Sequence, residues 1–131
     1  MIVAVDASAA VEYLLRTELG HVVEGVIANA DLVAPELLDA EVLAVVRREV
    51  VAKRLSSERA AEAIEDLADW PVERIAHRLL LREAWRLRAN VSAYDALYLA
   101  AARLRGATLL TADGPLARAP RLGIPVYDVR G

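Results

Sequence analysis

Short apolar runs alternate with longer segments of helical periodicity along this chain. Residues 2–5 (IVAV) are all apolar and residues 107–111 (ATLLT) are nearly so, a pattern typical of strands buried on both faces of a sheet. Further strands are predicted at 32–35, 71–75 and 124–129. Helices are predicted at 7–16, 20–30, 36–54, 56–70, 76–90, 92–106 and 114–120.

This alternation predicts an α/β fold: a short, mostly parallel sheet of about four or five strands, with right-handed crossovers and helices on both faces. The 131 residues suffice for one domain with a real core, and no repeat or linker divides them, so we interpret residues 1–131 as a single domain. Cysteine is absent, which removes disulfides and thiolate metal ligands.

The apolar runs also bear on location. The longest fall short of the roughly 20 residues that a membrane span needs, and no basic segment precedes residues 2–5 as it would in a signal peptide. We therefore expect a cytoplasmic protein with no membrane partner.

The net charge of −3 argues against bulk electrostatic binding of nucleic acid. Basic residues nevertheless cluster in two places, at Arg47, Arg48, Lys53 and Arg54 and at Arg78, Arg82, Arg86 and Arg88. Arginine suits bidentate phosphate contacts. A GC-rich genome would give the same preference for arginine over lysine, and we prefer this simpler explanation.

Two aspartates follow predicted strands. Asp6 comes directly after residues 2–5, and Asp113 closely follows residues 107–111. Because the carboxyl ends of parallel strands meet at one edge of a sheet, both side chains are expected there. Each also has an ordinary explanation, since aspartate often caps a helix N-terminus.

Two further acids lie near helix starts. Asp95 follows Ser92 at the spacing of a capping box. Glu41 lies in the second turn of its helix, too far along to act as a cap. A helical wheel places it on the stripe that carries Arg48, so a buried ion pair between the two is the alternative to a ligand role. Asp39 is a rival candidate, and the pattern alone does not choose between Asp39 and Glu41.

Carboxylates that converge without histidine or cysteine suggest a site for a hard cation. Mg²⁺ and Mn²⁺ take oxygen ligands and retain bound water. Without a cation, crowded carboxylates repel and raise each other's pKa. Such a metal can activate a water and stabilise charge on a phosphoryl group, which predicts phosphodiester hydrolysis.

Four motifs together carry a family resemblance. They are VDAS (5–8), PELLDAEVLAVVRR (35–48), AYDALYLAAA (93–102) and LLTADGPLARA (109–119). In this order and spacing they resemble a PIN-domain ribonuclease, most closely the VapC toxins of toxin–antitoxin pairs, over essentially the whole chain. The resemblance implies a PIN-like fold.

The resemblance also implies a catalytic, metal-binding quartet, which would hold Mg²⁺ or Mn²⁺ and which selects Glu41 over Asp39. Its members are Asp6, Glu41, Asp95 and Asp113. Ser8 and Thr111 match hydroxyl positions that line the site and orient the acids. Many relatives carry a basic residue close behind the last acid, whereas the first one here is Arg118.

The partners implied by the resemblance are RNA, as a single-stranded segment or a loop of tRNA or ribosomal RNA, a second copy in a homodimer, and a cognate VapB-type antitoxin. DNA would be contacted only indirectly, when the antitoxin binds the operator. Segments 9–15 and 37–46 carry more apolar surface than one sheet face needs, so we expect the antitoxin there.

Two other functions fit parts of the sequence. A non-catalytic PIN-fold module would act through dimerisation and antitoxin-mediated operator binding, but the presence of all four acids favours the nuclease. A phospho-receiver-like domain would place a lysine near its acidic pocket, and Lys53, the only lysine, lies at the far end of a helix.

Several other side chains have ordinary interpretations. His21 and His77 are expected at the surface, and Trp70 and Trp85 in the core or a dimer contact rather than in base stacking. Tyr98 is expected to pack, and the role of Tyr94 is open.

Overall fold

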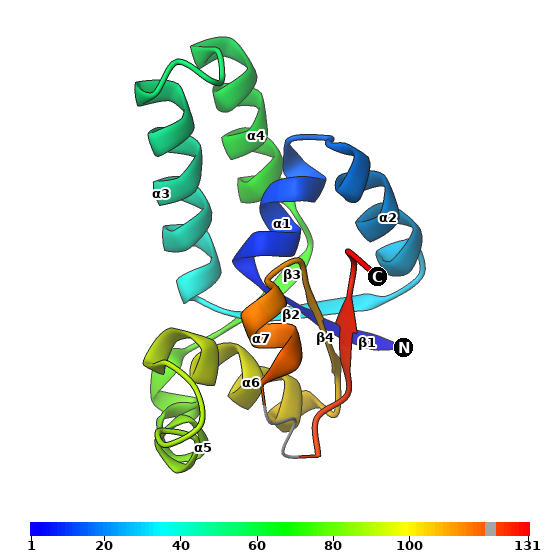
Figure 1. Ribbon diagram of the computed structural model, residues 1–131, viewed down its shortest axis with the longest axis vertical. Helices are drawn as coiled ribbons and strands as arrows, with labels where there is room; N and C mark the ends of the chain where they lie inside the picture. The colour runs from blue at the N-terminus through cyan, green and yellow to red at the C-terminus, as the bar shows by residue number, and fades with distance from the viewer. Residues whose placement is uncertain (120–122) are drawn as a thin grey trace.

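A five-stranded, all-parallel sheet forms the centre of the structure, a computed structural model that describes residues 1–119 and 123–131 (Figure 1). The strands are β1 (Ile2–Val5), β2 (Asp31–Pro35), β3 (Val72–Ile75), β4 (Thr108–Thr111) and β5 (Val126–Asp128). Their order in the sheet is β3-β2-β1-β4-β5. The chain therefore adds β2 and β3 on one side of β1, and then β4 and β5 on the other side of β1. The junction of β1 and β4 is the switch point of the sheet.

Helices cover both faces of this sheet. They are α1 (Ala7–Leu14), α2 (Glu18–Ile27), α3 (Leu37–Val51), α4 (Ser57–Asp69), the 3₁₀ helix η1 (His77–Leu79), α5 (Leu81–Arg86), α6 (Ala93–Arg105) and α7 (Gly114–Arg118). Helix α6 packs on β1, β2 and β4 from one side, and α1 packs from the other together with α2, α3 and α4 (Figure 1). The predicted α/β fold with a parallel sheet is confirmed.

The apolar runs form the centre of the core, as their pattern predicted. Val5 on β1 and Leu109 and Leu110 on β4 have no exposed surface. Helix α6 lies against these strands with three consecutive buried alanines, 100–102, whose small side chains allow close approach. The helix ends where Gly106 takes up the left-handed conformation at φ 61°, which glycine adopts without strain.

The helix predicted at 76–90 is wrong in its extent. The segment forms only η1 and the six-residue α5. Neither of these short helices has a side-chain cap bond at its start, and His77 instead accepts a hydrogen bond from the backbone N–H of Leu37 at 2.9 Å. Leu80 and Leu87 are the buried anchors of the segment, so tertiary contacts override its helical propensity.

The last predicted helix is observed as α7 and ends at Arg118, and its expected final residue, 120, lies outside the described residues. Among the described residues, none of the helices combines the length and the apolar character needed to cross a membrane.

Close packing of α1 against α2 depends on Gly20. A Cβ atom at this position would lie 2.2 Å from the backbone carbonyl oxygen of Glu12. Backbone atoms cannot move aside as a flexible side chain can, so the contact requires glycine at this position. Gly25, on the same helix, has open space around its Cα.

We therefore expect opposite effects from two alanine substitutions in α2. Gly20→Ala should lower the free energy of unfolding by about 2 kcal/mol because the methyl group overlaps the backbone of α1. Gly25→Ala should raise it by about 0.5–1 kcal/mol because alanine favours the helix. Urea unfolding followed by circular dichroism measures both, and equal effects of the two substitutions would contradict this packing.

Candidate active site

An acidic cleft lies at the carboxyl edge of the sheet, beside the junction of β1 and β4. Its volume is about 410 Å³, and α1, α3 and α6 contribute to its walls. All four acids singled out in the sequence line it: Asp6, Glu41, Asp95 and Asp113. Glu12 and Glu49 line it as well, and the sequence analysis missed both because neither stands at a strand end or a helix start. Asp39 does not line the cleft, because its carboxylate pairs with Arg74 at 3.0 Å.

Asp6 is the most constrained of these acids. It is buried and caps α1, with Oδ1 accepting from the Ala9 N–H at 2.9 Å and from the Ser8 hydroxyl at 2.7 Å. Its Oδ2 accepts from the Thr111 hydroxyl at 2.5 Å. Ser8 Oγ in turn accepts from the Ala112 N–H at 2.9 Å, which joins α1 to the end of β4. The two predicted hydroxyls therefore both contact Asp6.

The pKa of Asp6 is raised to about 6, chiefly by burial and to a smaller extent by the negative charge of Asp113. The hydrogen bonds from Thr111, Ala9 and Ser8 lower this pKa but offset only part of the effect of burial. At neutral pH Asp6 is therefore an anion held at a free-energy cost. A cation in the cleft would relieve that cost.

The other two aspartates lie at helix starts and line the cleft. Asp95 lies in the first turn of α6, where its N–H donates to Ser92 Oγ at 3.2 Å, and burial followed by the charge of Asp113 raises the pKa of Asp95. Asp113 caps α7 by accepting from the Leu116 N–H at 3.4 Å. Its own N–H donates to Thr111 Oγ1 at 2.9 Å, so Thr111 orients both Asp6 and Asp113.

The carboxylate of Glu41 accepts a hydrogen bond from a tyrosine. The alternative considered in the sequence was an ion pair with Arg48. The Tyr98 hydroxyl donates to Glu41 Oε1 at 2.6 Å, and in the described part of the chain Arg48 forms no ion pair with Glu41. Burial and then the hydrogen bond to Glu41 raise the pKa of Tyr98 far above its ordinary value, so the phenol is a neutral donor. Tyr98 was expected only to pack. Its position three residues after Asp95, on one helix face, was the signal for a second role.

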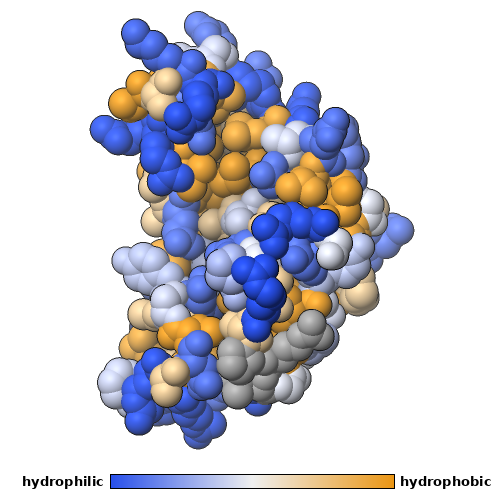
Figure 2. Space-filling model, viewed as in Figure 1, coloured by the Kyte–Doolittle hydropathy of each residue, from blue (hydrophilic) through white to orange (hydrophobic). Residues whose placement is uncertain are grey.

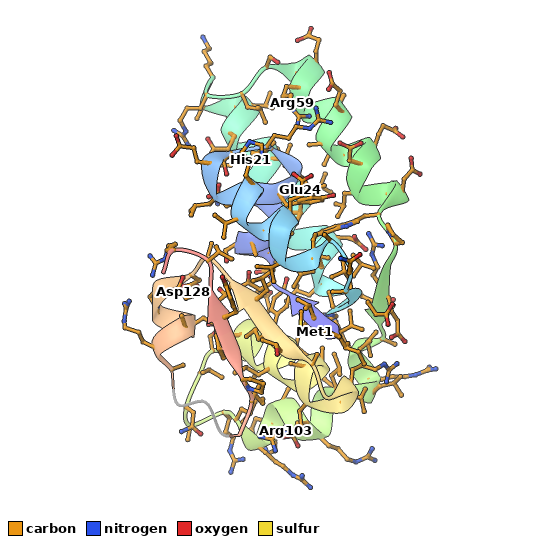
Figure 3. The ribbon with its side chains drawn as sticks, turned by 90° about the vertical axis from the view of Figure 1, so that its right-hand side faces the viewer. Met1, His21, Glu24, Arg59, Arg103 and Asp128 are labelled. Atoms are coloured by element: carbon orange, nitrogen blue, oxygen red, sulfur yellow. The ribbon has the colours of Figure 1, made fainter. Side chains whose placement is uncertain are left out.

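The remaining predicted residues divide clearly. Trp70 is buried and stacks on Tyr13 with ring centroids 5.1 Å apart, so its assignment to the core is confirmed. Trp85 is 68% exposed, and a core position for it is wrong. His21 is exposed and lies beside Glu24 on α2 (Figure 3). His77 is not a free surface residue, because its ring caps the start of α3.

The chemistry of the cleft can be compared with the needs of a metal ion. Carboxylates and the hydroxyls of Ser8 and Thr111 are oxygen donors, which suit a hard cation. Among residues 1–119 and 123–131, however, no three histidine, cysteine or carboxylate side chains are gathered so that they could hold an ion as they stand. Hydrogen bonds direct Asp6 to Thr111, Glu41 to Tyr98 and Asp113 to the N-terminus of α7. Within the described residues Asp6, Glu41, Asp95 and Asp113 form no ion pair, whereas Glu49 pairs with Arg54. The cleft therefore offers carboxylates of suitable type but not a closed cage.

Comparison with known proteins places this chain in a family. The model of the PIN domain matches residues 3–122. The chain is 39% identical over 128 residues to Ribonuclease VapC1 of Mycobacterium tuberculosis, and the match covers 96% of each protein.

Two solved structures share the fold. VapBC2 from Rickettsia felis, bound to a DNA fragment from its promoter, has a TM-score of 0.66 at 17% identity, over 98% of both chains. Mycobacterium tuberculosis VapC20, a Sarcin-Ricin loop cleaving toxin, has a TM-score of 0.65 at 18% identity, over 87% of this chain and 92% of that one. These findings confirm the resemblance carried by the four sequence motifs, and the chain belongs to the PIN-domain family.

Proposed function

We propose that this protein is a metal-dependent endoribonuclease toxin that hydrolyses RNA phosphodiester bonds and is neutralised by a cognate antitoxin. The observation that carries the proposal is the convergence of four acids, from four separate parts of the chain, on one cleft at the switch point of the sheet. The similarity to Ribonuclease VapC1 over nearly the whole chain supports RNA as the substrate.

Asp6, Glu41 and Asp95 would be the principal ligands of Mg²⁺ or Mn²⁺, with Asp113 as the fourth acid. A bound ion of this kind supplies an activated water and stabilises charge that develops on the phosphoryl group. The oxygen-only donor set and the raised pKa of Asp6 and Asp95 support a cation here.

The surrounding residues orient these acids. Ser8 and Thr111 hold the carboxylate of Asp6, and Tyr98 directs Glu41 into the cleft from the opposite wall. These are neutral donors, so they fix the carboxylates without cancelling the charge that attracts the metal.

The substrate and partners follow from the same proposal. The cleft would act on a loop of tRNA or ribosomal RNA in the cytoplasm. VapC20, which shares the fold, is named for cleaving the Sarcin-Ricin loop. The protein would form a homodimer, and DNA would be contacted only through the antitoxin, in keeping with the promoter-bound VapBC2 structure.

One observation favours a second candidate. Because the described carboxylates do not form a ready metal cage, a non-catalytic module that acts through dimerisation and antitoxin-mediated operator binding also fits the fold. The two candidates differ in one measurable property, which is RNA cleavage by the antitoxin-free protein.

The nuclease proposal predicts which acids matter. With Mg²⁺ or Mn²⁺, antitoxin-free protein should cleave labelled RNA, and Asp95→Asn or Glu41→Gln should slow cleavage by on the order of 100-fold or more, because each removes a ligand charge. Asp39→Asn is the matched control and should cleave normally, since its carboxylate faces Arg74. Equal cleavage by wild type and Asp95→Asn would refute the site, and no cleavage by wild type would favour the binding module.

The raised pKa of Asp6 predicts a pH-dependent cost in the metal-free protein. The folded state disfavours ionised Asp6, so the wild type should lose stability as the pH rises from about 4 through about 6, the folded-state pKa. Asp6→Asn cannot ionise and should have a free energy of unfolding about 1–3 kcal/mol above that of wild type near pH 7.5, with a smaller difference near pH 5.

Thermal or urea unfolding in EDTA at the two pH values measures this difference. Asp31→Asn, an exposed acid on β2, is the control and should show no such dependence. Adding Mn²⁺ near pH 7.5 should stabilise the wild type more than Asp6→Asn. A wild type that gains stability relative to Asp6→Asn over this pH range would show that Asp6 is not strained by burial.

The antitoxin contact expected on the first helices can be proposed for one particular groove. Figure 2 shows apolar side chains gathered over α3, α4 and the neighbouring α1. Leu43 is half exposed and lines an apolar groove between α3 and α4 together with Ile64, Leu67 and Ala68. Leu14, by contrast, is buried, so its substitution would test folding and not binding.

Leu43→Asp should therefore weaken binding of the cognate antitoxin at least tenfold, because a charge replaces an apolar contact. Calorimetric titration of the toxin with its antitoxin measures the affinity. Val22→Asp, an exposed position on α2, is the control and should have little effect. Stabilisation by Mn²⁺ should be the same in both variants, and equal antitoxin affinities would move the contact away from this groove.

A further inference from the structure

Helix α5 and the start of α6 present an exposed aromatic and cationic face. Trp85 is 68% exposed and Tyr94 is 59% exposed. Both border a groove of about 450 Å³ whose walls include Leu81, Arg88 and Val91. Large aromatic rings that are exposed to water often mark an interaction site, so this face is a candidate binding surface.

The local structure holds this face rigidly. Leu80 and Leu87 are buried and fix α5 to the core, which turns Trp85 outward. The guanidinium of Arg88 lies 4.7 Å from the centroid of the Trp85 ring, and Arg88 Nη1 donates to the Trp85 carbonyl oxygen at 3.0 Å. The cation and the ring therefore form one preordered surface.

The face also carries one of the two basic clusters of an acidic chain. Four arginines and one glutamate lie between residues 78 and 90, whereas the whole protein has a net charge of −3. The glutamate, Glu83, is shared by Arg86 and Arg103. Within the described ranges, no carboxylate lies at ion-pair distance from Arg82 or Arg88. Figure 2 shows hydrophilic side chains beside apolar ones over α5.

This groove adjoins the acidic cleft through one turn of helix. Tyr94 lines the groove and the next residue, Asp95, lines the cleft. Ser92, which caps α6 and holds the Asp95 N–H, also lines the groove. A ligand lying in the groove therefore comes within one residue of the proposed metal ligands.

We propose that Trp85, Arg88 and Tyr94 form a stacking platform for single-stranded RNA, with Arg82 available to its phosphates. The inference rests on the nuclease function proposed above and adds the surface that positions its substrate. Nucleic acid bases stack on exposed aromatic rings and on guanidinium planes without regard to sequence. The backbone phosphates bind arginines that have no other ionic partner. The platform supplies an attraction for RNA that the acidic cleft alone cannot.

Charge favours RNA over a second copy of the chain as the occupant. A two-fold dimer would bring this face against itself and gather the arginines of both copies at one interface. An RNA strand instead carries the opposite charge and offers flat apolar rings to Trp85 and Tyr94. A dimer through this face is the alternative that the experiment has to exclude.

The test measures RNA binding apart from cleavage. Full-length protein is titrated into a fluorescein-labelled single-stranded RNA oligonucleotide in EDTA at low salt, and anisotropy gives the Kd. Trp85→Ala and Tyr94→Ala should each raise the Kd roughly tenfold, because each removes a stacking surface. Tyr127→Ala is the matched control, since it removes an exposed tyrosine on β5 that lies outside the groove. Arg82→Ala, which removes the proposed phosphate contact, should also make the salt dependence of the Kd shallower.

Sedimentation of the same variants tests the dimer. The platform is overturned if the wild type does not bind the RNA, if Trp85→Ala binds it as tightly as wild type, or if Trp85→Ala separates a dimer while leaving the Kd unchanged. Metal-dependent cleavage is scored separately. Cleavage that persists with an unaltered KM in Trp85→Ala refutes the platform but not the nuclease, whereas Trp85-dependent binding by a protein that never cleaves refutes the nuclease alone.

Discussion

The buried carboxylate of Asp6 is the constraint around which the rest of the site is arranged. It stands where β1 becomes α1, beside the end of β4, at the only place where the strand order of the described sheet reverses. An anion without partners at such a position would cost several kcal/mol. Three donors from two elements, Ala9, Ser8 and Thr111, reduce that cost. The same bonds join the first strand–helix unit to the last one, so stability and site geometry depend on one group.

In this protein an acid that caps a helix can also line the cleft. Asp6 and Asp113 accept the backbone N–H groups that open α1 and α7, and Ser92 plays that part for α6 while Asp95 projects from its first turn. A helix start at the carboxyl edge of a parallel sheet points its free N–H groups toward the switch point. Helix starts at this edge lie close together, and this explains why Asp6, Asp95 and Asp113, each at the start of a different helix, line one cleft.

The sequence predicted most of this arrangement because its signals are local. Strands buried on both faces produce the runs at 2–5 and 107–111, and an acid directly after such a run must lie at the carboxyl edge. The choice of Glu41 over Asp39 needed the family resemblance, since a helix pattern does not say which face meets the cleft and which meets Arg74. The interaction of Tyr98 with Glu41 joins residues 57 positions apart. Contacts of that kind depend on how α3 and α6 cross, which no local pattern encodes.

The segment from 76 to 90 is a second place where the local sequence pattern does not predict the structure. Its leucines and arginines have the propensity of one continuous helix, yet His77 caps α3 and Leu80 and Leu87 anchor the segment at two points, which leaves only a short α5. This break leaves Trp85 exposed to solvent in the groove that adjoins the acidic cleft. A cleft rich in carboxylates attracts a cation and repels a phosphate chain. If the proposed RNA substrate binds here, a basic surface close to the cleft would offset this repulsion, and the segment 78–88 next to it carries two arginines, Arg82 and Arg88, that form no ion pair within the described residues.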